Sequence, residues 1–239
     1  MTTQTSPQLS TSSVDWTKFA VRMTIVCSFF PILLFLSAGS LDWRMGWVYI
    51  ILAISITVIS RYLMIRRNPG LFAERSQALS REDTKGWDKI LSPTLALGPL
   101  VIIVIAGLDY RLDWSPAFSV WVELLGLVLL IIGYLFATWA MLVNAYFSSA
   151  VRIQTDRGQQ VVTNGPYRIV RHPSYLGLLL GNVGTSLVLS SLWSLIPTAI
   201  LTIVIIVRTA LEDATLQNEL PGYRDYAQKT RYRLIPGLW

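Results

Sequence analysis

Residues 119–143 read SVWVELLGLVLLIIGYLFATWAMLV, an apolar stretch with one charged side chain, Glu123. A helix needs roughly 20 such residues to cross the hydrocarbon core of a bilayer, so this stretch decides the fold class. Comparable apolar stretches lie on both sides of it. We expect six spans, at about 19–38, 46–65, 92–107, 119–143, 175–190 and 192–211, with the third and fifth short. The sequence therefore predicts an all-α integral membrane protein with about six transmembrane helices.

The composition excludes several other classes of protein. Of the 239 residues, 53% are hydrophobic and 14% are charged, whereas charged residues make up about 25% of an average soluble domain. The net charge of +6 lies in short segments between apolar stretches, which indicates membrane orientation and not nucleic-acid binding. Cys27 and His172 are the only residues of their types, so an intramolecular disulfide and a cysteine/histidine metal cage are excluded. We expect the lipid bilayer as a partner, and neither nucleic acid nor a metal ion.

The basic residues predict the orientation in the membrane. Lys and Arg in short loops are retained on the cytoplasmic side. Eighteen of the twenty fall on one side of the predicted spans, and only Arg44 and Arg111 fall on the other. Both termini are therefore expected in the cytoplasm. Residues 1–18, rich in Ser, Thr and Gln, are expected to form a disordered cytosolic tail.

The predicted spans are poor in ionisable groups, which argues against a pump or proton relay. Glu123 lies near one end of its span and is expected to reach the interface. Gly177, Gly181 and Gly184 lie within the fifth span, where small residues allow close helix packing. Only a few residues separate the fifth span from the sixth. We therefore expect the two to form a tight helical hairpin.

Conformationally restricted residues gather in the segment VVTNGPYRIVRHPSYLG, residues 161–177. A residue before proline is disfavoured in the helical region, so Pro166 and Pro173 predict a turn-rich loop over residues 163–172. Pro173 suits the first position of a helix, and the free N–H groups of the next turn favour a carboxylate or a phosphate. A positive-inside loop would explain the arginines alone. The density of Pro, Gly, Tyr and the single His favours a shaped site.

A second polar segment, VRTALEDATLQNELPGYRDYAQKTRYRLIPGLW, covers residues 207–239. Arg208 and Glu212 are four residues apart, a spacing that allows a surface salt bridge of about 0.3–0.5 kcal/mol. Glu212 and Asp213 lie near the predicted end of the sixth span, where acids oppose the helix dipole. Either the helix continues to about residue 219, where a Pro-Gly pair follows, or the acids hold a cation, or both.

The two segments resemble the isoprenylcysteine carboxyl methyltransferase family and its relatives among the phospholipid methyltransferases. One family pattern is present as Gly165-Pro166-Tyr167 followed by Arg171-His172-Pro173-Ser174-Tyr175-Leu176-Gly177. The other is present as Arg208, Glu212-Asp213, Tyr223, Tyr226 and Pro236. Together the patterns cover roughly the C-terminal third of the chain. The acidic pair is Glu-Asp where the family has Glu-Glu, so we give Glu212 more weight than Asp213.

The resemblance implies a membrane methyltransferase with S-adenosylmethionine as its cofactor. The cofactor-binding residues that it implies are Tyr167, Arg171, His172, Pro173, Tyr175, Gly177, Glu212 and Asp213. The catalytic residues that it implies are Arg208, Glu212 and His172, and the substrate-binding residues are Arg208, Tyr223 and Tyr226. The cofactor carries an ammonium group, a carboxylate and a sulfonium, so an acid, a donor-rich partner and a desolvated pocket would suit it.

The expected reaction is methyl transfer to a lipophilic small molecule or a prenylated substrate, with a carboxylate of the isoprenylcysteine type favoured as acceptor. In domain terms, the tail covers residues 1–18, a four-helix membrane region covers 19–143, and a methyltransferase-like region with the hairpin and a cytoplasmic tail covers 144–239. One alternative is an N-methyltransferase for phospholipids or other amines. Another is an NADPH-dependent sterol or enone reductase, because those enzymes have a similar C-terminal layout. The last is a non-enzymatic scaffold or transporter, which would leave both polar segments unexplained.

Overall fold

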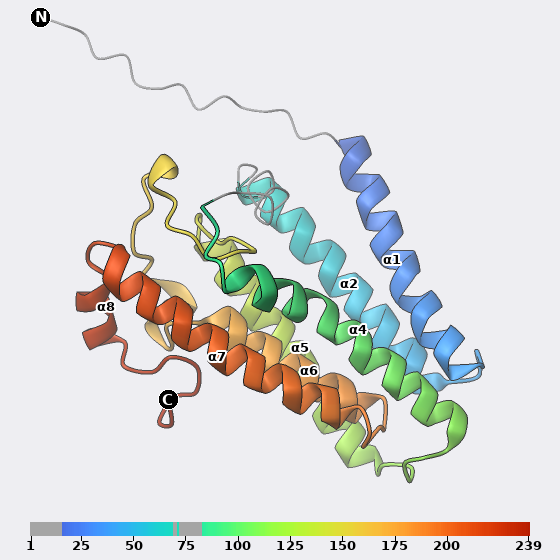
Figure 1. The fold of residues 1–239 in the computed structure, drawn as a ribbon. Coiled ribbons are helices and arrows are strands. Elements are labelled where there is room, and N and C mark those ends of the chain that lie inside the picture. Colours follow the sequence, from blue (N-terminus) through green and yellow to red (C-terminus); the bar gives the residue numbers. More distant parts are fainter. Residues whose placement is uncertain (1–15, 69–70, 72–82) are drawn as a thin grey trace, which may run out of the picture.

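The computed structural model describes residues 16–68, 71 and 83–239, and within these residues the chain forms helices and loops without a β-strand (Figure 1). The long helices are α1 (Trp16–Ala38), α2 (Arg44–Arg67), α4 (Asp88–Leu112), α5 (Val120–Val143), α6 (Pro173–Val188) and α7 (Leu195–Glu219). Three shorter helices are η2 (Thr155–Arg157), η3 (Gly165–Arg168) and α8 (Tyr223–Lys229). The prediction of an all-α fold is confirmed for this part of the chain.

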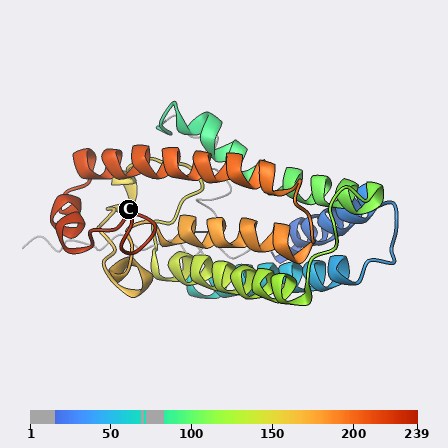
Figure 2. The same ribbon diagram turned by 90° about the horizontal axis from the view of Figure 1, so that it is seen from below.

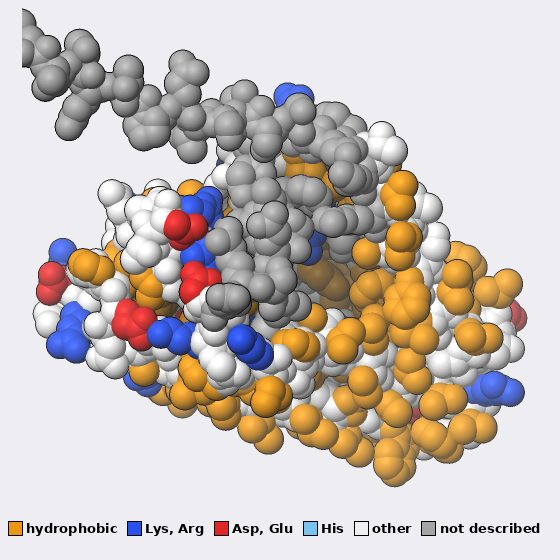
Figure 3. All heavy atoms as spheres, turned by 45° about the horizontal axis from the view of Figure 1, so that its top comes forward, with side chains coloured by type: hydrophobic (Ala, Val, Ile, Leu, Met, Phe, Trp, Pro, Cys, Tyr) orange, Lys and Arg blue, Asp and Glu red, His pale blue; other side chains and the backbone are white. Residues whose placement is uncertain are grey.

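Five of the described helices, α1, α2, α4, α5 and α7, are long and apolar enough to cross a membrane. Exposed apolar side chains cover much of the helical surface, whereas charged side chains gather near the end that carries α8 (Figure 3). The remaining predicted span corresponds to α6, which has 16 residues. At 1.5 Å per residue α6 is about 24 Å long, shorter than a hydrocarbon core of roughly 30 Å. The prediction of an integral membrane protein is confirmed, and five of the six predicted spans meet the length requirement.

Three predicted boundaries differ from the structure. The third span is not short, because α4 has 25 residues and accommodates Pro93 and Pro99 within the helix. The sixth span continues beyond its predicted end, since α7 runs to Glu219, as the longer-helix alternative required. Helix α1 begins at Trp16, so residues 16–18 of the predicted tail are helical. The rest of that tail lies outside the described residues.

Helix α6 lies between α5 and α7 (Figure 2). A Cβ atom added to Gly177 would lie 2.5 Å from the carbonyl oxygen of Gly133, and one added to Gly184 would lie 2.7 Å from that of Gly126. Only glycine allows such contacts, so α5 and α6 pack backbone against backbone. The packing role predicted for Gly177 and Gly184 is confirmed. Gly181 is different, because a Cβ atom there would meet nothing within 4 Å although the residue is buried.

Replacement of Gly177 by alanine is expected to destabilise the fold by about 1–3 kcal/mol, because the added methyl group would collide with backbone atoms that cannot move aside. Gly181→Ala is the matched control on the same helix and should leave stability nearly unchanged. Thermal unfolding of the two purified variants in detergent measures the difference. Equal melting temperatures would show that α5 and α6 do not pack as closely as described.

Candidate functional site

The loop before α6 is joined to the C-terminal tail by backbone hydrogen bonds. The N–H of Arg171 donates to the carbonyl of Tyr232, and the N–H of His172 donates to the carbonyl of Arg233, both at 2.9 Å. Helix α6 begins at Pro173, as the sequence predicts, so His172 lies at its N-terminal boundary. The predicted loop also contains the short helix η3. These bonds join two segments that are about 60 residues apart in sequence.

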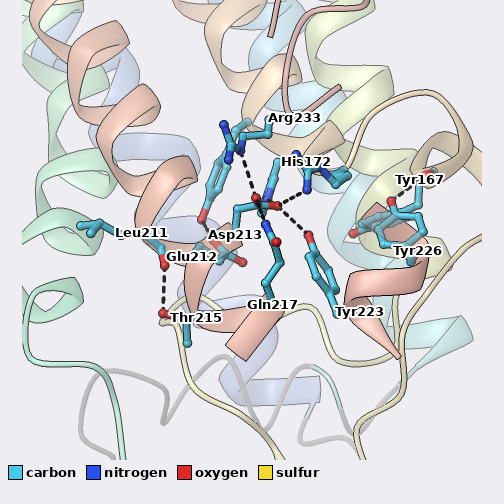
Figure 4. Close-up of polar contacts among 12 residues, drawn as sticks. Tyr167, His172, Leu211, Glu212, Asp213, Thr215, Gln217, Tyr223, Tyr226 and Arg233 are labelled. Carbon is cyan, nitrogen blue, oxygen red and sulfur yellow. Dashed lines mark hydrogen bonds and ion pairs between the residues drawn. The ribbon is translucent and has the colours of Figure 1, made fainter. Parts of the chain in front are cut away.

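Asp213 of α7 lies at the centre of this arrangement and is fully buried. Its carboxylate accepts from five described side chains: Arg171 Nη1 (3.1 Å), His172 Nε2 (3.3 Å), Gln217 Nε2 (2.7 Å), Tyr223 Oη (3.1 Å) and Arg233 Nε (3.0 Å). Figure 4 shows the side chains of His172, Gln217, Tyr223 and Arg233 around this carboxylate. A buried carboxylate is stable only when it is paired and hydrogen-bonded, and Asp213 meets both conditions.

Glu212, the neighbour of Asp213, faces a different environment. Its carboxylate accepts a hydrogen bond from the hydroxyl of Tyr175, the third residue of α6. The ring of Tyr175 stacks on the ring of His172 at a centroid distance of 5.8 Å. Glu212 and Tyr175 both line the large cavity described below, whereas Asp213 is not among the residues that line it. The two adjacent acids therefore differ in role, and Asp213 holds other side chains in place.

Arg208 is buried and pairs with Asp88 at the start of α4. Its Nε donates to Oδ1 of Asp88 at 2.6 Å and its Nη2 donates to Oδ2 at 2.9 Å. The same Nη2 donates to the carbonyl of Ser149 at 3.0 Å. Arg208 does not form the surface salt bridge with Glu212 that the sequence allowed. Two of its guanidinium nitrogens bond instead to the carboxylate of Asp88, which lies on another helix. The guanidinium also lies 5.3 Å from the centre of the Tyr175 ring.

Three buried tyrosines close the side of the site next to α8. Burial raises the pKa of Tyr223 above its ordinary value, and the nearby charge of Asp213 adds to the shift. Burial likewise raises the pKa of Tyr167 and that of Tyr226. All three phenols therefore remain protonated at neutral pH and act as donors, as the bond of 2.7 Å from Tyr226 to the Tyr167 carbonyl illustrates.

A cavity of about 490 Å³ opens beside these groups, a volume within the range of small-molecule sites. The sequence-predicted site residues that line it are Tyr167, Arg171, His172, Pro173, Tyr175, Gly177, Arg208, Glu212, Tyr223 and Tyr226. Apolar residues of four spanning helices line its other part: Phe30, Ile56, Leu95, Pro99 and Ala137. The polar site is thus continuous with space between membrane-spanning helices. Of the predicted site residues, Asp213 alone does not line this cavity.

Sequence reasoning missed several residues that build this site. Asp88, Gln217 and Arg233 fix the charged groups, and Asn144 donates to the Tyr167 hydroxyl at 3.0 Å. Asp88 could not be found from the sequence, because no motif around it distinguishes it from other residues between two spans. The basic residues of the C-terminal tail were a sequence signal for Arg233, because a buried acid such as Asp213 needs a positively charged partner. Within the described ranges, no group of three or more His, Cys, Asp or Glu residues could hold a metal ion.

Comparison with known proteins shows which class of protein the sequence of this chain resembles. The sequence model of the phospholipid methyltransferase family matches residues 121–220, a range that begins in α5 and reaches the end of α7. This range contains the loop before α6, Arg208 and both acids. It therefore covers most of the side chains that line the polar part of the cavity.

Individual relatives narrow the class. Protein-S-isoprenylcysteine O-methyltransferase A of Arabidopsis thaliana is 36% identical over 70 residues, which are 29% of this chain and 36% of that protein. Protein-S-isoprenylcysteine O-methyltransferase B of the same plant is 34% identical over 70 residues, again 29% of this chain and 36% of the relative. A probable protein-S-isoprenylcysteine O-methyltransferase of Oryza sativa subsp. japonica is 36% identical over 69 residues, 28% of this chain and 36% of that protein.

The matched segment spans only 36% of the length of these curated relatives. Part of this chain is nevertheless related to the isoprenylcysteine carboxyl methyltransferases, in agreement with the resemblance carried by the two motifs.

Proposed function

We propose that this protein is a membrane methyltransferase that uses S-adenosylmethionine to methylate the carboxylate of a lipophilic acceptor of the isoprenylcysteine type. One observation carries the proposal: a single cavity has charged and hydrogen-bonding side chains in one part and apolar side chains of the spanning helices in the other. Such a cavity suits an acceptor with a polar reacting group and a lipid tail. The relation to enzymes of that name supports the proposal.

The residues present fit the proposed cofactor. Arg171 lines the cavity, and its buried Nε atom has no hydrogen-bond partner among the described residues. Arg171 is therefore suited to the carboxylate of S-adenosylmethionine. Glu212, on the same cavity wall, is suited to the ammonium group. When bound, the cofactor would supply a methyl group activated by the sulfonium charge. Tyr167, His172, Pro173 and Tyr175 would enclose it.

The protein's own part in such a reaction is alignment and exclusion of water, because methyl transfer is an in-line displacement. Arg208 would orient the acceptor carboxylate, since Asp88 holds its guanidinium at the cavity wall. Tyr223 and Tyr226 would contact the acceptor through their rings, because their hydroxyls are engaged with Asp213 and Tyr167.

We favour a carboxylate acceptor over an amine because the relatives are named as O-methyltransferases of isoprenylcysteine. A carboxylate is already ionised and needs no general base, whereas an amine must first be neutral. The Asp213 carboxylate engages Nε2 of His172 and leaves Nδ1 as the ring nitrogen that could take a proton from an amine. An amine acceptor remains the second candidate, because the matching family model is described as phospholipid methyltransferase.

The test is a methyl-transfer assay on the purified protein in detergent with radiolabelled S-adenosylmethionine. N-acetyl-S-farnesylcysteine and phosphatidylethanolamine would be offered separately, with cofactor binding measured in parallel by calorimetry. We expect a base-labile methyl ester on the cysteine derivative and no labelled lipid amine. Labelled phosphatidylethanolamine would replace the first proposal by the second, and binding of NADPH in place of S-adenosylmethionine would favour a reductase.

We further propose that both termini and the polar site face the cytoplasm, as the basic residues of the sequence predict. In a Cys27→Ser background, a cysteine at Ala117, in the exposed loop between α4 and α5, should react with an impermeant thiol reagent on intact cells. A cysteine at Gln228, exposed on α8, should react only after the cells are opened. Labelling of Gln228→Cys from outside would reverse the proposed orientation.

A further inference from the structure

The segment that follows α8, residues 231–239, lies against the helix bundle (Figure 2). Leu234 is buried in one apolar cluster with Leu201 and Ile205 of α7, and Trp239 packs against this cluster. Ile205 precedes Asp213 by eight residues, which corresponds to about 12 Å along the helix axis. The segment therefore returns from the polar site to the apolar part of the helix bundle.

The same segment also exposes apolar side chains. Leu238 exposes 76% of its surface, and Tyr232 and Ile235 are exposed as well. Ile169, in the loop that is hydrogen-bonded to the segment, is likewise exposed. Trp239 beside them is of a residue type that is enriched at the membrane–water interface. Apolar side chains that the protein leaves uncovered mark a contact surface, and the edge of a bilayer would cover these.

The exposed cations next to this surface have no acidic partner. Arg168 and Arg231 are exposed, and their side chains make no hydrogen bond or ion pair with the described residues. The sequence contains no Asp or Glu within residues 161–172 or 226–239. Asp225 on α8 is the nearest acid along the chain to Arg231. Two positive charges are therefore available to an anion from outside the protein.

Basic side chains beside exposed apolar ones are typical of a segment that lies in the interface of an anionic bilayer. We infer that residues 231–239, together with Arg168 and Ile169, form an interfacial anchor that binds anionic phospholipid headgroups. The two free arginines pair with the lipid phosphates, and Ile235 and Leu238 lie in the bilayer. Lipid is the partner because this segment packs on helices that cross the membrane. The anchor involves neither the cofactor nor the acceptor of the proposed function.

The anchor is joined to the candidate site. The carbonyls of Tyr232 and Arg233 accept from the N–H groups of Arg171 and His172. The guanidinium of Arg233 also donates to the buried carboxylate of Asp213 at 3.0 Å. Binding of headgroups by the anchor therefore holds the segment to which the loop before α6 is bonded.

The test measures how deeply residue 238 lies in the bilayer. In a Cys27→Ser background, Leu238→Cys would carry an apolar nitroxide label, with the whole chain in phosphatidylcholine nanodiscs that contain or lack phosphatidylglycerol. Collisions with oxygen, which dissolves in lipid, and with a water-soluble nickel complex give the ratio of embedded to water-exposed label. Each cation near an anionic surface contributes about fivefold at low salt, so phosphatidylglycerol should raise this ratio about thirtyfold.

Two double variants locate the effect. Arg168→Gln/Arg231→Gln should abolish the response to phosphatidylglycerol. Arg44→Gln/Arg111→Gln is the matched control, because it removes the same charge from exposed arginines at the opposite end of the bundle. It should keep the response. Equal depth of the label in the two kinds of nanodisc would overturn the inference, as would a response that survives in Arg168→Gln/Arg231→Gln. The depth is measured without S-adenosylmethionine or an acceptor, so this inference and the proposed function fail separately.

Discussion

Asp213→Asn is expected to destabilise the folded protein by about 3–5 kcal/mol, the range found when one partner of a buried ion pair is removed. The substitution leaves the guanidinium groups of Arg171 and Arg233 beside a neutral amide. It also introduces N–H donors where His172 and Tyr223 now donate to the carboxylate. The loop before α6 and the C-terminal tail would then lose their common anchor on α7. Thermal unfolding in detergent should show a large drop in melting temperature.

The neighbouring substitution Glu212→Gln is the matched comparison, because it removes the same charge one residue away. Glu212 lines the cavity, and its described partner is the Tyr175 hydroxyl, which can also donate to an amide oxygen. We expect the melting temperature to change little. Binding of S-adenosylmethionine should weaken by about 1.5–3 kcal/mol, the value of a hydrogen bond to a charged group. If both variants lower stability equally and leave cofactor binding unchanged, the proposed division between an anchoring acid and a binding acid is wrong.

This division shows where sequence reasoning reached its limit. The two motifs predicted that the loop around His172 and the acidic end of α7 form one site, and the contacts of Arg171 and His172 with Asp213 bring them together. The motifs could not rank the two acids. Successive residues on a helix are about 100° apart, so one acid can face the protein interior while the next faces a cavity. The neighbours of α7 decide which is which, and the sequence does not display them.

The lengths of the helices could be predicted from the sequence better than their packing. Apolar runs predicted every long helix, because hydrophobic length is a local property. The run that became α6 was predicted as a span, yet this helix has only 16 residues. Its contacts with α5 depend on Gly126 and Gly133 lying opposite Gly184 and Gly177. Such a match between two helices is a tertiary property, which the glycines of either segment alone could not specify.

The ion pair between Asp88 and Arg208 is the clearest tertiary feature that local spacing concealed, since 120 positions separate its members. The sequence suggested Glu212 as a partner for Arg208 because it is one helical turn away. Arg208 pairs with Asp88 because both carboxylate oxygens accept from its guanidinium nitrogens, and such bidentate pairs are strong in a buried position. It also accepts from the N–H of Val151 at 2.6 Å, which ties the segment after α5 to α4.

Asp88→Asn alone is therefore expected to cost about 3–5 kcal/mol of stability, because it leaves Arg208 charged and unpaired in a buried position. The double variant Asp88→Asn/Arg208→Met should recover most of that loss. It removes both charges, fills the space with an apolar side chain and keeps an amide oxygen for the Val151 N–H. Thermal unfolding of the single and double variants in the same detergent measures the coupling between the two residues.

The double variant then separates the two possible roles of Arg208. If Arg208 orients the acceptor carboxylate, the stably folded double variant should bind S-adenosylmethionine with little change but transfer methyl groups at least about a hundredfold more slowly, because a charged contact to the reacting group is lost. If the double variant transfers methyl groups at the normal rate, Arg208 serves only to hold α4 against α7. The proposed contact with the acceptor would then have to pass to another donor of the cavity wall, which also contains Arg61, Arg152 and Arg171.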